Sequence, residues 1–199
     1  MKNYFKILDK LIHFDTTSSN SNIEAIDYIE SLFKQKKNYH IIKVYNSTKN
    51  KCSLLIKQRG DISKGILFAG HIDTVSVSGQ KWSSNPFKLI NNNGKLFGRG
   101  VVDMKGFLSL VIANMLNESS SRLPFCLSVT HDEETGCEGI YNLSKYIQKK
   151  NILMPDKCIV GEPTKTKIVT ANKGAAVIDT IVRCKKDLGH SSNYNQKVN

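Results

Sequence analysis

Short apolar runs that are typical of buried strands alternate along this chain with segments of helical periodicity. The runs at 65–70 (GILFAG) and 124–130 (PFCLSVT) have the length and composition of buried strands. Helical patterns mark residues 3–13, 21–35, 105–116 and 139–150. Because strands and helices alternate, we predict an α/β fold with a mixed, partly parallel sheet flanked by helices.

Shorter signals complete the expected order of elements. Further strands are predicted at 40–45 and 52–58, a strand and turn at 157–164, and two more strands over 167–186, broken at Lys173-Gly174. Asn93-Gly94 stands between two short apolar segments and predicts a hairpin. Ser21 and Glu24 have the spacing of a capping box at the start of the second helix.

The composition indicates one hydrophobic core in a protein without a membrane span. The chain has 199 residues, 40% of them apolar, which leaves little for a second core. No run of 18 uncharged apolar residues occurs, and the N-terminus lacks the apolar region of a signal peptide. The cysteines are odd in number and form no CxxC pair: Cys52, Cys126, Cys137, Cys158 and Cys184. We therefore expect free, buried thiols in the reducing cytoplasm.

The formal net charge of +12 raises the alternative of a basic nucleic-acid-binding module. Such a module needs clustered lysine and arginine with interleaved aromatic residues, and the lysines here are dispersed. We therefore expect a solvated basic surface, with neither nucleic acid nor membrane as a partner.

Six of the 17 acidic residues come just after apolar strand-like segments, namely Asp73, Asp103, Asp132, Glu133, Glu134 and Glu162. In open α/β sheets, ligands bind beyond the carboxyl ends of the strands, so these acids are expected to gather at one rim. Carboxylates held together repel one another unless a cation joins them. His71 beside several carboxylates suits zinc or a similar metal. Each motif alone also has a structural reading, such as a hydrogen-bonded turn for His71 and Asp73.

Six motifs together resemble a known family, in the family's order: GHIDTV, W…PF, GKLFGRGVVDMKG, DEETGCEG, GEPT and GHSS. The sequence resembles the acetylornithine deacetylase and succinyl-diaminopimelate desuccinylase family of zinc metallopeptidases, which also includes carboxypeptidase G and aminoacylases. This resemblance implies a zinc aminopeptidase-like catalytic domain over 1–175. It implies that 176–199 begin an α+β lid and dimerisation domain, and that the full-length protein is a homodimer.

The resemblance also implies a set of metal ligands. His71 and Glu162 would bind one metal ion, Glu134 would bind a second, and Asp103 would bridge the two. A complete site would hold two Zn²⁺ ions, for which Co²⁺ is a possible substitute.

Three further residues receive catalytic roles from the same resemblance. Glu133 would be the general base that takes a proton from a metal-activated water, and Asp73 would orient the His71 ring. His190 would reach the active site of the partner subunit and stabilise the oxyanion. His13 and His40 are expected to be structural or exposed, and His131 has no role that the resemblance supplies.

The implied reaction is removal of the acyl group from an N-acyl amino acid, with N-acetylornithine, cleaved to ornithine and acetate, as the first candidate. Succinyl-diaminopimelate, another N-acyl amino acid or a dipeptide is the alternative. Family members continue beyond the region matched here, and a later histidine completes their second metal site. We therefore expect the 199-residue chain alone to be weakly active or inactive, and a non-catalytic remnant stays a further alternative.

Overall fold

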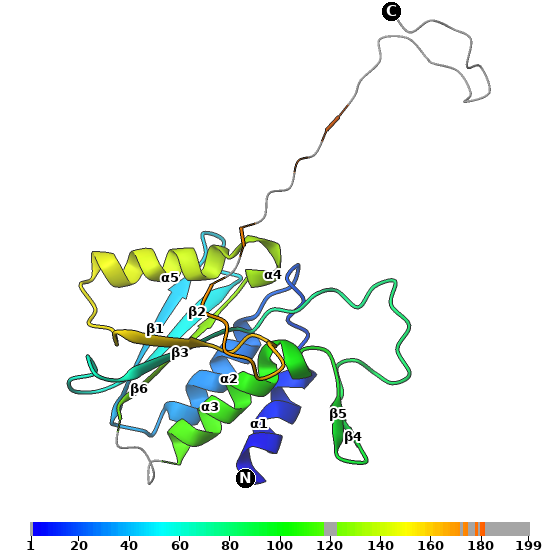
Figure 1. Cartoon of the computed structure of the whole chain (residues 1–199), viewed down its shortest axis with the longest axis horizontal. Coiled ribbons are helices and arrows are strands. Elements are labelled where there is room, and N and C mark those ends of the chain that lie inside the picture. Colours follow the sequence, from blue (N-terminus) through cyan, green and yellow to red (C-terminus); the bar gives the residue numbers. More distant parts are fainter. Residues whose placement is uncertain (1, 118–122, 172, 175–177, 179, 182–199) are drawn as a thin grey trace, which may run out of the picture. The chain divides into compact units, whose positions relative to one another are not determined.

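The computed structural model of the chain describes residues 2–117, 123–171, 173, 174, 178, 180 and 181 (Figure 1). The chain divides into two units, residues 1–166 and 167–199, and the helices and strands of the described residues all lie in the first. The two strands predicted over 167–186 are absent from the described residues of that range, and its other residues lie outside the description.

A five-stranded mixed sheet forms the centre of the first unit, in the order β1-β2-β6-β3-β7. Neighbouring strands are antiparallel from β1 to β6, whereas β3 runs parallel to both β6 and β7. The bounds are β1 Tyr39–Tyr45, β2 Cys52–Gln58, β3 Ile66–His71, β6 Phe125–Thr130 and β7 Lys157–Val160. The predicted mixed, partly parallel sheet is therefore confirmed.

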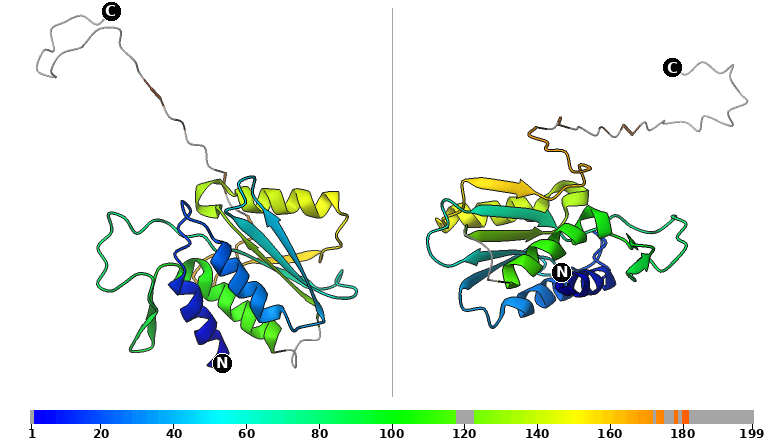
Figure 2. Two further views of the ribbon diagram at one scale, coloured as in Figure 1. Left: turned by 180° about the vertical axis from the view of Figure 1, so that it is seen from behind. Right: turned by 60° about the horizontal axis from the view of Figure 1, so that its bottom comes forward.

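Helices cover both faces of this sheet, as two views of the chain show (Figure 2). One face carries α1, α2 and α3, and the other carries α5. The bounds are α1 Lys2–His13, α2 Ile23–Phe33, α3 Gly106–Leu116 and α5 Glu138–Lys149. None of the described helices is long and apolar enough to cross a membrane.

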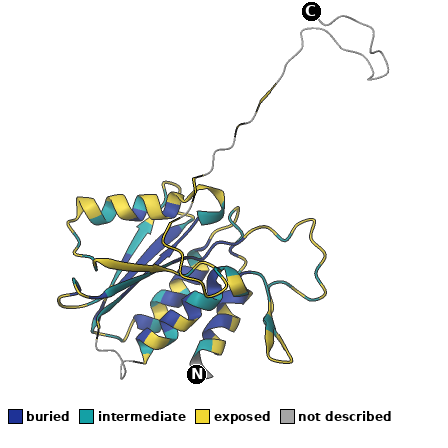
Figure 3. Cartoon of the chain, viewed as in Figure 1, coloured by how far each residue is buried: buried dark blue, intermediate teal, exposed yellow. Residues whose placement is uncertain are grey.

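Alternation along the strands divides the core between the two faces. Leu54 and Ile56 of β2 are fully buried in the larger cluster, which faces α1, α2 and α3. Leu55, between them, belongs to a smaller cluster with Leu143 of α5. Burial colours in Figure 3 follow this pattern, with dark strands at the centre and a yellow outer side on α5. Because side chains alternate with period two, one short strand contributes to both layers.

Shorter elements connect the layers near the rim of the sheet. Strands β4 (Ile90–Asn92) and β5 (Lys95–Phe97) form the predicted hairpin, whose Asn93 and Gly94 both have positive φ. A kinked segment, η1 (Val101–Lys105), in which Asp103 and Met104 have non-helical backbone angles, precedes α3, and the four-residue helix α4 (Glu133–Gly136) precedes α5.

The cysteine prediction is half right. Cys52 and Cys126 are free and buried, but Cys137 and Cys158, also free, are exposed. Cys158 lies on β7, a strand at the edge of the described sheet whose four residues are all exposed, and Cys137 lies in the turn between α4 and α5. Cys184 lies outside the described residues.

The predicted capping box is wrong, because α2 begins at Ile23, two residues after Ser21. Asn22 is the N-cap, and its amide does not bond the helix. Instead, Asn22 Nδ2 donates to the Cys52 carbonyl at 2.9 Å, and the Cys52 N–H donates to Asn22 Oδ1 at 2.8 Å. Asn22 therefore joins the start of α2 to the start of β2.

Replacing Asn22 by alanine is expected to lower the free energy of unfolding by about 2–4 kcal/mol, because both buried peptide groups of Cys52 lose their partner. Urea denaturation followed by circular dichroism measures the change. Ser21→Ala is the control, since Ser21 is exposed, and it should cost less than about 1 kcal/mol. Equal costs for the two substitutions would contradict this account.

Candidate metal centre

The candidate site lies beyond the carboxyl ends of the three parallel strands. His71 is the last residue of β3, and the turn of α4 follows β6 directly. Glu162 comes two residues after β7, and Asp103 comes from η1. Parallel strands end on the same side of a sheet, so residues far apart in sequence meet there.

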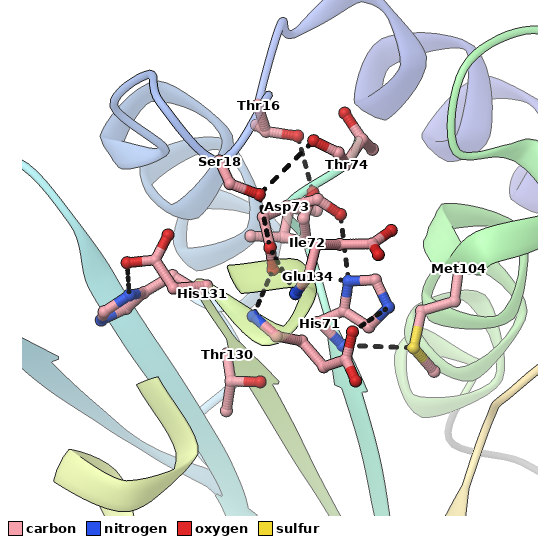
Figure 4. A network of polar contacts seen from close by, with 12 residues as sticks. Thr16, Ser18, His71, Ile72, Asp73, Thr74, Met104, Thr130, His131 and Glu134 are labelled. Atoms are coloured by element: carbon pink, nitrogen blue, oxygen red, sulfur yellow. Dashed lines mark hydrogen bonds and ion pairs between the residues drawn. The ribbon is translucent and has the colours of Figure 1, made fainter. Parts of the chain in front are cut away.

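His71 is the buried centre of the site, with 1% of its surface exposed. Its Nε2 lies 3.0 Å from Asp103 Oδ1, 3.8 Å from Glu133 Oε2 and 4.0 Å from Glu162 Oε1. On the other side of the ring, Nδ1 lies 3.0 Å from the backbone oxygen of Asp73 and 3.4 Å from its Oδ1 (Figure 4). With Nδ1–H donating to Asp73, Nε2 is the ring nitrogen that faces the carboxylates.

Three side chains converge closely enough to share one ion. His71, Asp103 and Glu134 each offer a ligand atom, and these atoms lie within 4.8 Å of one another. Glu162 is not a member of this set, although its carboxylate faces the same imidazole nitrogen. The side chains of Asp103, Glu133 and Glu162 are 39–44% exposed, so the site is open to solvent on one side.

The charges of the site shift the pKa values of its groups. Burial disfavours the charged His71 ring, but hydrogen bonding to Asp73 and the charges of Asp73, Asp103 and Glu133 outweigh burial and raise the His71 pKa to about 9. Burial and then the charges of neighbouring carboxylates raise the pKa values of Glu134 and Glu162. Without a cation, the rim therefore holds more negative charge than it accommodates easily.

Asp73 holds the helix turn that carries the two glutamates. Its Oδ1 accepts the Glu133 N–H at 3.2 Å, and its Oδ2 accepts the Glu134 N–H at 3.1 Å. The Ser18 hydroxyl also donates to Oδ2, at 2.9 Å. Although burial opposes ionisation, these bonds and His71 lower the Asp73 pKa. Asp73 thus contacts both the imidazole and the turn, whereas sequence reasoning assigned it the imidazole alone.

Lys105 supports the segment that carries Asp103, and sequence reasoning missed it. Its ammonium group is buried and donates to the carbonyls of Leu11 at 3.0 Å and Phe14 at 2.9 Å, at the end of α1. Burial lowers the pKa of Lys105 to about 7, although the negative charges of Asp15 and Asp73 act to raise it. A lysine at the start of an otherwise apolar helix is unexpected. Its position in the sequence is the signal that could have identified Lys105 as a buried, structural residue.

Glycine is required where this segment passes Lys105. Gly100 has φ +82°, and a Cβ there would lie 2.9 Å from Thr74 Cγ2 and 3.1 Å from Lys105 Cδ. A Cβ on Gly106 would lie 2.3 Å from the carbonyl oxygen of Val101. Gly100 and Gly106 therefore permit close packing around Asp103.

The other histidines are not part of the described site. His13 and His40 are exposed, as predicted. His131 is buried and pairs with Asp132, its Nδ1 lying 3.0 Å from Asp132 Oδ2. His190 lies outside the described residues.

The sequence has known relatives. The profile described as Peptidase family M20/M25/M40 matches residues 67–191. An acetylornithine deacetylase of Buchnera aphidicola subsp. Schizaphis graminum (strain Sg) is 34% identical over 206 residues, which cover 98% of this chain and 51% of that protein. The chain therefore spans about half the length of the curated relatives that it matches.

Two solved structures have a similar fold. Human carnosine dipeptidase 1 has a TM-score of 0.65 at 19% identity, covering 80% of this chain and 38% of that one. The M20 family metallo-carboxypeptidase Sso-CP2 from Sulfolobus solfataricus has a TM-score of 0.64 at 21% identity, covering 81% and 37%. These likenesses support the α/β fold, and the profile match covers more than half of the sequence. The chain belongs to peptidase family M20/M25/M40, as its motifs implied.

Proposed function

We propose that the cluster at the strand ends is the divalent-metal site of an amidohydrolase. One imidazole among several carboxylates is a donor set that suits zinc or a similar ion. The raised pKa values of Glu134 and Glu162 reflect burial and mutual repulsion, which a bound cation relieves. The convergence of His71, Asp103 and Glu134 within 4.8 Å is the observation that carries this proposal.

The ligand assignment for two Zn²⁺ ions follows the family resemblance, and the 4.0 Å between His71 Nε2 and Glu162 Oε1 is compatible with it. His71, Asp103 and Glu162 would hold one ion, and Asp103 with Glu134 would hold the second, with Co²⁺ as a substitute. When bound, the metal supplies Lewis-acid chemistry, because it acidifies water and polarises an amide carbonyl. The Asp73 carbonyl supports this arrangement, since it accepts a bond from His71 Nδ1 and leaves Nε2 free for a metal.

Glu133 is proposed as the general base. Its carboxylate lies 3.8 Å from His71 Nε2, beside the ligand atoms, and is exposed enough for water and substrate to reach it. It would take the proton of the attacking water and return that proton to the leaving amine nitrogen. The adjacent Glu134 belongs to the ligand cluster, so the two neighbouring glutamates have separate tasks.

We propose N-acetylornithine as the substrate, hydrolysed to ornithine and acetate, since curated relatives at 34% identity are named acetylornithine deacetylase. Succinyl-diaminopimelate and dipeptides are the competing substrates for an assay. The chain spans about half the length of these relatives, so slow hydrolysis is the expected activity of the 199 residues.

Several other predictions belong to the same proposal. They are a catalytic domain over 1–175, the start of a lid and dimerisation domain over 176–199, a homodimer and an oxyanion role for His190. The four described cysteines are all free, which supports the predicted cytoplasmic location.

Replacing Glu133 by glutamine is expected to leave metal binding intact and to lower hydrolysis of N-acetylornithine about 10²–10⁴-fold, because the general base is lost. Acetate release by the purified chain measures turnover, with the Buchnera aphidicola deacetylase as the reference enzyme. Hydrolysis by the unmodified chain that does not exceed that of Glu133→Gln would contradict the proposed activity.

His71→Ala should weaken zinc binding at least about 100-fold, since it removes the only buried ligand of the proposed set. Metal content after dialysis, measured by atomic emission, reports the loss. His40→Ala is a matched control, because His40 is exposed on β1, away from the site. Zinc retained equally by both variants would place the metal elsewhere.

Zinc binding should strengthen as the pH rises toward 9, because the metal-free His71 ring has a pKa of about 9. Below that pH the ring holds a proton that a metal must displace, so affinity should increase about tenfold between roughly pH 7 and pH 8. Calorimetric titration in buffers of different ionisation enthalpy should show release of about one proton from His71. An affinity that is constant over this range would disagree with a protonated imidazole.

A further inference from the structure

Beside the proposed ligands, a closed ring of polar contacts joins four separate parts of the chain. Lys51, just before β2, donates to the Ser18 carbonyl and forms an ion pair with Asp132. The Ser18 hydroxyl donates to Asp73, which accepts the N–H groups of Glu133 and Glu134. We call this set the Lys51 ring; its members are Ser18, Lys51, Asp73, Asp132, Glu133 and Glu134.

The ring is mostly shielded from water. The side chains of Lys51 and Asp132 are 12% and 10% exposed, and Asp73 is buried. The second carboxylate oxygen of Asp132 lies 3.0 Å from His131 Nδ1, so both oxygens have partners. A charge pair with so little exposure is costly to break, because the remaining partner is left buried and uncompensated.

The backbone of the glutamate turn needs such support. Asp132 has φ +57° and Cys137 has φ +61°, so left-handed residues stand at both ends of α4. A helix of four residues has almost no internal bonding to hold this shape. The contacts that hold its first turn are therefore those of Asp73 and Asp132.

Ser18 brings a further segment into this arrangement. Its N–H donates to the Thr74 carbonyl at 3.1 Å, and the Thr16 hydroxyl donates to the Ile72 carbonyl at 2.6 Å. The loop after α1 thus lies along the strand exit that carries His71 and Asp73, as Figure 4 shows. Lys51 is the one cation that connects this loop to Asp132 among the described residues.

We infer that Lys51 is a positioning residue for the glutamate turn: it fixes Asp132 and Ser18, and through Asp73 it sets where Glu133 and Glu134 lie. It contacts neither glutamate side chain in the described structure. Its effect on the turn is independent of any metal, whereas its effect on metal binding rests on the proposed function.

Amide hydrogen exchange of the metal-free chain tests the inference directly. In Lys51→Met, exchange at the Glu133 and Glu134 amides should accelerate by on the order of tenfold or more, with the amides of central β2 and β6 unchanged. Lys43→Met is the matched control, because Lys43 also forms ion pairs, with Asp27 and Glu30, but on β1. It should leave both glutamate amides as protected as in the unmodified chain.

Co²⁺ titration adds a spectroscopic readout. Lys51→Met should weaken Co²⁺ binding about 10–100-fold, because loss of residues that hold metal ligands in place lowers metal affinity by about this factor. The visible absorption of the bound Co²⁺ should also change. Ser18→Ala removes one hydroxyl and serves where Lys51→Met does not fold, with the same direction of change expected in both readouts.

Glutamate amides as protected in Lys51→Met or Ser18→Ala as in the unmodified chain would overturn the inference. If the variants exchange these amides faster but the unmodified chain binds no Co²⁺, the positioning role of Lys51 is supported and the proposed metal site is contradicted. The two proposals therefore fail in distinguishable ways.

Discussion

Parallel pairing of β3 with β6 and β7 is the constraint on which the whole site depends. It brings the ends of three strands to one rim and places His71 between the turn after β6 and the segment after β7. Register matters as much as direction, because a slip of one residue would turn His71 to the opposite face of the sheet. The packed layers on both faces favour that register, since Phe68 of β3 packs against the larger cluster and Leu67 packs against the smaller one.

Charge at the rim is balanced by two means in this fold. A buried imidazole with a raised pKa offsets part of the negative charge in the metal-free chain. Hydrogen bonds from the turn of α4 and from Ser18 stabilise Asp73 as an anion directly behind that imidazole. The side chains of Asp103, Glu133 and Glu162 are partly exposed, so an ion can reach them from solvent.

Local patterns were sufficient for the five strands of the sheet, the hairpin, the longer helices and the acids at the strand ends, because hydrophobic periodicity and the residues at strand ends are visible along one stretch of chain. They were insufficient where distant segments decide the outcome. Ser21 and Asn22 are both good helix caps, and the choice between them depends on Cys52, thirty residues away. Lys51 and Ser18 lie in polar loops without periodicity, so their meeting with Asp132 exists only in the folded chain.

Burial of Lys105 links the end of the first helix to the segment that carries Asp103. The last carbonyls of α1 receive this ammonium group, which stands two residues from Asp103. Helix dipoles favour a cation at their carboxyl end, so the contact benefits helix and lysine alike. Helix α1 contributes no side chain to the candidate site but supports the segment that carries Asp103, so fraying of that helix would disturb the position of this acid.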